Sequence, residues 1–140
     1  MADLHIDDFY KDAARTLVQL YNAFPRKVAV YVEDISGPDT PDEYGIHSPR
    51  HQACFSAMLW LAEEGYIRYV DTIRQEAIDQ AVLTYKAFVL LNSPAPVSPG
   101  ADSPIPERIT HLQRLRQAIA SGSSRALGEA MSDLLAPPVR

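Results

Sequence analysis

The 140-residue chain contains only one cysteine, one tryptophan and six glycines, and it has no excess of positive charge. Cys54 alone cannot form an intramolecular disulfide, so we expect a reducing, cytoplasmic setting. Thirteen Lys and Arg residues against eighteen Asp and Glu leave a net charge of −5, which disfavours tight non-specific binding to nucleic acid. The scattered glycines form no phosphate-binding loop. The longest strongly apolar run, residues 87–91, is far too short to cross a membrane.

The chain does have enough apolar residues to fold, since 46% of it is hydrophobic and it includes seven Tyr and four Phe. We expect residues 1–92 to form a folded domain. Residues 93–106 contain five prolines and predict an extended linker. Residues 107–140 show helical periodicity on both sides of a Ser-Gly-Ser turn, which predicts a C-terminal helical hairpin.

The expected fold class is mainly α with a small antiparallel β wing. Helices are expected over residues 7–24, 48–65, 85–91, 107–120 and 124–135. Strands are expected over residues 27–35, 66–70 and 80–83, with a helical turn within residues 73–78 as an alternative. Ser48, followed by a proline, and Thr84 are the expected helix caps. Residues 36–46 are acidic and proline-rich, which indicates a surface loop.

Two stretches carry a resemblance to a known family. The first is Leu-Trp-Leu-Ala-Glu-Glu-Gly-Tyr-Ile-Arg at residues 59–68, and the second is Ala-Val-Leu-Thr-Tyr-Lys-Ala-Phe-Val-Leu-Leu at residues 81–91. Together with the order helix, strand, helix, hairpin and short helix over residues 7–91, they resemble a winged helix-turn-helix domain over about three fifths of the chain. In that family a helix leads into the wing, and a Leu-Thr pair opens the next helix.

The resemblance implies a DNA-binding protein that regulates transcription, with double-stranded DNA as its partner. Arg50, His51 and Gln52 would lie near base edges at the start of the recognition helix, and Arg68 and Arg74 of the wing near phosphates. The plain alternative is that these are solvated positions of a helix and a half-exposed hairpin. Winged helices also serve as protein-interaction modules. The net charge and the acidic residues 39–43 favour that second role, with another protein as the partner.

No nucleophile with a base and no carboxylate pair is evident, so we expect neither an enzyme nor a cofactor. His47, His51 and Cys54 stand at spacings of four and three, which would bring them near one metal ion on a single helix face. Pro49 places the helix start after His47, however, and a fourth ligand would have to come from elsewhere, such as the acidic residues 42–43. We therefore predict no metal site and expect Cys54 to be a buried apolar residue.

Each helix of the expected C-terminal hairpin has a single apolar stripe, which it must bury against another surface. That surface is either the chain's own core or a second copy of the chain. Closed twofold dimers are the commonest assemblies, so a homodimer is expected.

Overall fold

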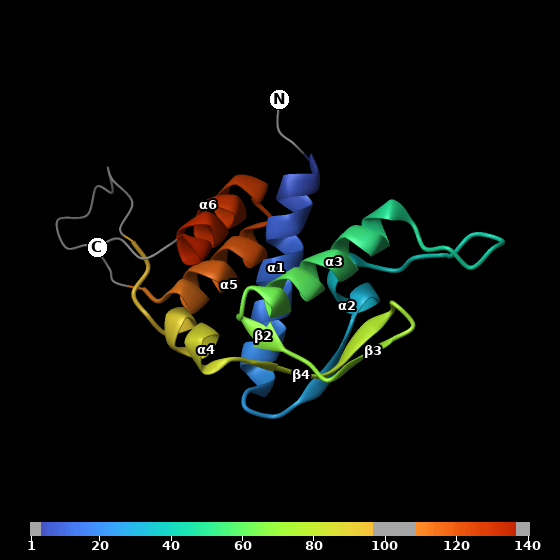
Figure 1. The fold of residues 1–140 in the computed structure, drawn as a ribbon. Helices are drawn as coiled ribbons and strands as arrows, with labels where there is room; N and C mark the ends of the chain where they lie inside the picture. Colours follow the sequence, from blue (N-terminus) through green and yellow to red (C-terminus); the bar gives the residue numbers. More distant parts are fainter. Residues whose placement is uncertain (1–3, 97–108, 137–140) are drawn as a thin grey trace.

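A computed structural model describes residues 4–96 and 109–136 of the chain (Figure 1). These residues form the mainly α fold with a small antiparallel sheet that the sequence predicts. None of the helices within the described ranges is long and apolar enough to cross a bilayer. The elements, in chain order, are α1 (Leu4–Ala23), β1 (Val28–Tyr31), α2 (Val32–Ser36), α3 (Pro49–Glu63), β2 (Ile67–Arg68), β3 (Asp71–Ile73), β4 (Ala77–Leu83), α4 (Tyr85–Leu91), α5 (His111–Ser121) and α6 (Ser124–Leu135).

Strand β4 organises the sheet, because it pairs antiparallel with each of the other three strands. Val30 of β1 lies opposite Ile78, and Ile67 of β2 lies opposite Leu83. The strands lie in the order β1-β4-β2. From α1 to α4 the chain follows the order helix, strand, helix, hairpin and short helix described from the sequence, with α2 and β3 as additional elements. Membership of the winged-helix family itself stays a prediction.

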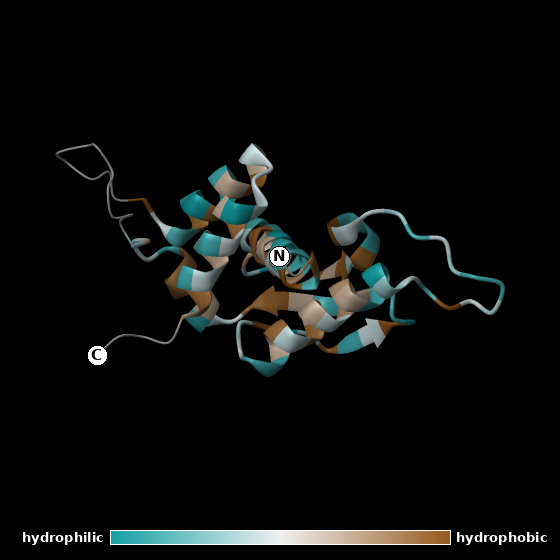
Figure 2. Ribbon diagram, turned by 90° about the horizontal axis from the view of Figure 1, so that it is seen from above, coloured by the Kyte–Doolittle hydropathy of each residue, from teal (hydrophilic) through white to brown (hydrophobic). Residues whose placement is uncertain are grey.

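Helix α1 passes through the centre of the molecule and packs against α3, β4, α5 and α6 (Figure 1). Figure 2, seen from above, places α5 and α6 on one side of α1, and α3 with the sheet on the other. One continuous core results. Its largest fully buried side chains include Leu17, Leu20, Met58, Leu61, Ile78, Leu115 and Met131.

The C-terminal hairpin therefore buries its apolar stripes on α1 of the same chain, which answers the question that the sequence left open. This packing gives no argument for a second copy, and the homodimer stays a prediction. Most of the predicted linker, residues 93–106, lies outside the described residues. Its first residues pair with the start of the hairpin, since the Ala95 amide donates to the Ile109 carbonyl and the His111 amide to the Ser93 carbonyl.

Several predicted elements differ from the structure in their bounds. The strand expected over residues 66–70 covers only Ile67–Arg68, and a separate strand, β3, follows at Asp71–Ile73. The strand expected over residues 27–35 ends at Tyr31, and the chain turns into α2, which buries Val32 and Ile35 three positions apart on one helical face. The return strand begins at Ala77 rather than at residue 80, so the alternative of a helical turn there is wrong. A tight turn makes this early start possible, because Arg74 and Gln75 both adopt positive φ, at 48° and 61°.

The caps set the helix ends. Ser48 and Thr84 cap α3 and α4 as predicted, each through its side-chain oxygen. Helix α5 starts at His111, later than the expected residue 107, because Thr110 and Gln113 form a reciprocal capping box. Helix α1 starts at Leu4, three residues before the expected position.

Candidate functional site

The predicted base-contacting residues occupy the first turn of α3. The Ser48 hydroxyl accepts a hydrogen bond from the His51 amide, and Pro49 fills the first helical position, so the helix begins where the sequence indicated. The three side chains that follow have different surroundings. Gln52 is exposed and donates to the His47 carbonyl, whereas Arg50 and His51 both contact other parts of the fold.

Arg50 is held by the central helix. Its guanidinium donates two hydrogen bonds of 2.6 Å to the two carboxylate oxygens of Asp12, which is only 1% exposed. Its Nε lies 3.5 Å from Asp8 as well. The hydrogen bonds to Asp12 raise the pKa of Arg50 above its usual range. A contact between this guanidinium and a base would leave a buried carboxylate without its partner, which is costly.

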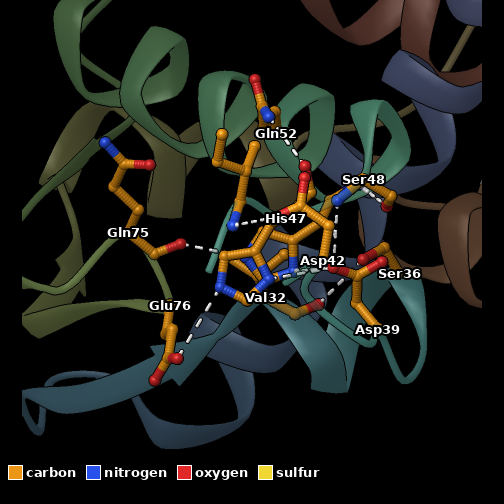
Figure 3. A network of polar contacts seen from close by, with 11 residues as sticks. Val32, Ser36, Asp39, Asp42, His47, Ser48, Gln52, Gln75 and Glu76 are labelled. Atoms are coloured by element: carbon orange, nitrogen blue, oxygen red, sulfur yellow. Dashed lines mark hydrogen bonds and ion pairs between the residues drawn. The ribbon is translucent and has the colours of Figure 1, made fainter. Parts of the chain in front are cut away.

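His51 is 2% exposed and stacks on His47, with the ring centroids 3.7 Å apart and the planes 6° from parallel. We call Asp39, His47 and His51 the histidine cluster (Figure 3). Asp39 Oδ2 lies 2.9 Å from His47 Nδ1, 3.1 Å from the Ser48 amide and 3.9 Å from His51 Nδ1. Hydrogen bonds from Ser48 and His47 lower the pKa of Asp39 to about 2.

The other ring nitrogens of the two histidines face the turn between β3 and β4. His51 Nε2 lies 3.0 Å from the Gln75 carbonyl, and His47 Nε2 lies 3.7 Å from the Glu76 carboxylate (Figure 3). His51 Nδ1 is buried and has no hydrogen-bond partner among the described residues. The cluster thus joins the β3–β4 turn to two segments that follow one another in the chain, the loop before α3 and the first turn of α3.

Residues 37–48 form a loop that projects from the body beside the start of α3, and we call it the projecting loop (Figure 1). Its tip is an ordered turn. The Asp42 carboxylate accepts hydrogen bonds from the Tyr44 and Ile46 amides at 2.8 and 3.0 Å, and Gly45 adopts a φ of 77°. The turn leaves Tyr44 79% and Ile46 56% exposed.

The basic residues of the wing lie on the surface. Arg68 on β2 and Arg74 in the β3–β4 turn are both exposed, and neither forms an ion pair within the described residues. A pocket of about 180 Å³ lies between residues of this turn and of α3. It is lined by His51, Gln52, Phe55, Ser56 and Gln75.

The group His47, His51 and Cys54 that the spacing suggested is brought together only in part. The two histidines meet, but their third neighbour is Asp39, and Cys54 is outside the group. Cys54 is fully buried as expected, and burial raises the pKa of its thiol to about 12. Nothing in the sequence pattern singled out Asp39, because its position depends on how the projecting loop returns to α3.

The chain was compared with known proteins at three levels. Neither the protein-family models, nor the curated proteins, nor the solved structures include a significant match.

Proposed function

We propose that the protein is a protein-binding module on a winged-helix type of scaffold, and that the projecting loop is its contact surface. The observation that carries this proposal is the exposure of Tyr44 and Ile46 on an ordered, projecting turn. Tyrosine is among the residues that contribute most to protein interfaces, since it offers a large apolar surface and a hydroxyl.

The hydrogen bonds of the loop favour binding because they reduce its conformational freedom before any partner arrives. Asp42 holds the tip, and Asp39 holds the base through His47 and the Ser48 amide. A segment that is already ordered loses less entropy on association. The saving in binding free energy is about 0.5–1.5 kcal/mol for each side chain that need not be immobilised. The acidic character of the loop indicates that the partner presents a basic or polar surface around an apolar pocket.

The contacts at the start of α3 disfavour the recognition of DNA bases. Arg50 is paired with a buried carboxylate and His51 is buried, so two of the three predicted base-contacting side chains already have partners inside the fold. A net charge of −5 acts in the same direction.

DNA binding is the second candidate, and one observation favours it. Gln52, Arg68 and Arg74 are all exposed, the first on α3 and the other two on the wing. They would provide one base contact and two phosphate contacts, a small number for a protein of this charge.

The test is site-specific photo-crosslinking in the cells that make the protein. A photo-crosslinking amino acid replaces Tyr44 in one variant and Tyr85, a control residue that is 75% exposed on α4, in another. We expect one discrete crosslinked protein from position 44 and none of the same mass from position 85. The crosslink should disappear when Asp42→Ala is added, because the turn then loses both side-chain hydrogen bonds.

A parallel titration follows fluorescence anisotropy with mixed-sequence duplex DNA from low to physiological salt. We expect no salt-sensitive binding. The proposal fails if the two crosslinking positions give the same products or none. Salt-sensitive DNA binding that weakens in the Arg74→Ala variant would establish the second candidate instead.

A further inference from the structure

The histidine cluster has the composition of a metal site. We propose that Asp39, His47 and His51 bind one zinc ion at the base of the projecting loop. This inference goes beyond the proposed protein-binding function and does not depend on it. It also departs from the sequence-based expectation of no metal, which rested on the helix start after His47 and on the need for a fourth ligand from elsewhere.

The hydrogen-bond geometry of His51 gives the first argument. Its Nε2 faces the Gln75 carbonyl at 3.0 Å, and since a carbonyl can only accept, this nitrogen carries the proton. In the neutral ring Nδ1 then has a free lone pair. That lone pair is buried, has no hydrogen-bond partner among the described residues and lies 3.9 Å from Asp39 Oδ2, another acceptor. Asp39 already accepts hydrogen bonds from His47 and the Ser48 amide, so the unsatisfied atom is the buried Nδ1 of His51, and a cation bound beside Asp39 would give it a partner.

The distances give the second argument. A separation of 3.9 Å is too long for a hydrogen bond between His51 and Asp39. Two ligands about 2.0–2.1 Å from a tetrahedral zinc ion lie roughly 3.4 Å apart. The observed separations from Asp39 Oδ2, 2.9 Å to His47 and 3.9 Å to His51, lie on either side of that value. The shorter one is the hydrogen bond between His47 and Asp39, and the ion would take the place of its proton, which is released to solvent. One ligand atom from each of the three residues lies within 4.8 Å of the other two.

The outer contacts suit metal binding as well. Histidines that bind metals commonly donate their second ring N–H to a carbonyl or a carboxylate, which fixes the ring. His51 has the Gln75 carbonyl in this role. The Glu76 carboxylate lies 3.7 Å from His47 Nε2, which is a charge contact rather than a hydrogen bond. The rings are parallel in the metal-free geometry and must splay to share an ion. His47 can turn for this purpose because the loop, not α3, carries it.

The ligand types select the ion. Two imidazoles and one carboxylate suit zinc, whereas calcium and magnesium prefer oxygen ligands alone. Three protein ligands leave a fourth position for solvent. The ion would tie the loop, through Asp39 and His47, to the first turn of α3, through His51.

The experiment uses the full chain after dialysis against a chelator. Isothermal titration with zinc chloride measures stoichiometry and affinity, and titration with Co²⁺ gives a visible absorption band typical of tetrahedral ligation. We expect one ion per chain. Asp39→Asn and His47→Gln, both on the loop and outside the core, should each weaken binding by at least about tenfold, as losses of even outer-shell partners do.

His111→Gln is the matched control, since His111 is also a buried histidine with an unpartnered Nδ1 but belongs to no group of three metal-binding side chains among the described residues. It should leave the affinity unchanged. Nitrogen-15 spectra of the imidazoles in the unsubstituted protein provide a measurement that needs no variant: zinc should shift Nδ1 of His47 and His51. The proposal is overturned if the titration shows no binding of one zinc ion per chain, or if both loop variants keep full affinity. It is also overturned if zinc shifts the nitrogen-15 signals of other histidines only.

Discussion

Replacing Arg50 with alanine should destabilise the fold, although Arg50 lies in the first turn of a helix at the surface. Its guanidinium is the only described side chain that pairs with the Asp12 carboxylate, and it does so through two hydrogen bonds of 2.6 Å. Asp12 is on the buried face of α1, among the residues that pack against α3. Arg50→Ala therefore leaves a buried carboxylate with neither its counter-ion nor its main hydrogen-bond donors.

The structure sets the size of the effect. Removing one partner of a buried ion pair costs about 3–5 kcal/mol. The Arg50 side chain is 33% exposed, so water enters the space it vacates and partly solvates Asp12. The free energy of unfolding should accordingly fall by about 3 kcal/mol, the lower end of that range. For a chain of this length the melting temperature should fall by roughly 6–12 °C.

Urea denaturation, followed by far-ultraviolet circular dichroism and by the fluorescence of Trp60, measures the change. Arg125→Ala is the control, because Arg125 pairs with Glu129 on the exposed surface and should change the free energy of unfolding by less than about 0.5 kcal/mol. Replacing both partners, with Asp12→Leu and Arg50→Met, should restore most of the lost stability. If Arg50→Ala behaves like the Arg125 control, the guanidinium is not needed by Asp12, and the argument against base contacts by Arg50 fails.

Three further predictions concern other parts of the fold. Cys54 is fully buried and its thiol pKa is raised to about 12, so a thiol reagent at pH 8 should label it only as fast as the protein unfolds; rapid labelling of the native protein would contradict this burial. Gly128→Ala should raise the free energy of unfolding by about 0.5–1 kcal/mol, because Gly128 lies inside helix α6 and the added methyl meets Tyr10 of α1 at an ordinary contact distance of 3.6 Å. Gly122→Ala should lower it by about 1 kcal/mol, since Gly122 ends α5 at a φ of 71°; equal effects in the two glycine variants would refute the distinction. Leu115→Ala should cost about 2–5 kcal/mol in a single unfolding transition, whereas two separate transitions would show that the C-terminal hairpin folds apart from the rest.

Elements with strong local signals were predictable. Ser48 and Thr84 cap helices as expected, because a cap depends on a few neighbouring residues and their backbone groups. The residues of α2 were missed, since five β-branched, acidic and polar residues give no helical periodicity; the burial of Val32 and Ile35 against neighbouring helices decides their conformation. The β3–β4 turn was misplaced for a similar reason, because Arg74 and Gln75 are unusual residues at positive φ.

The candidate site was predictable in its position but not in its contacts. Sequence placed Arg50, His51 and Gln52 together in one helical turn, and that placement is correct. The sequence could not show which of the three side chains face solvent, because the polarity of a short segment does not reveal which distant residues contact it.

The sequence by itself determined the fold class, the main helices and the acidic loop, because hydrophobic periodicity, caps and prolines act over a few residues. Tertiary structure alone decided the chemistry of the site. Asp12 reaches Arg50 across 38 positions of the chain, and the Gln75 carbonyl reaches His51 across 24. Whether a polar side chain is free to bind a partner depends on such distant contacts, and packing of the whole chain creates them.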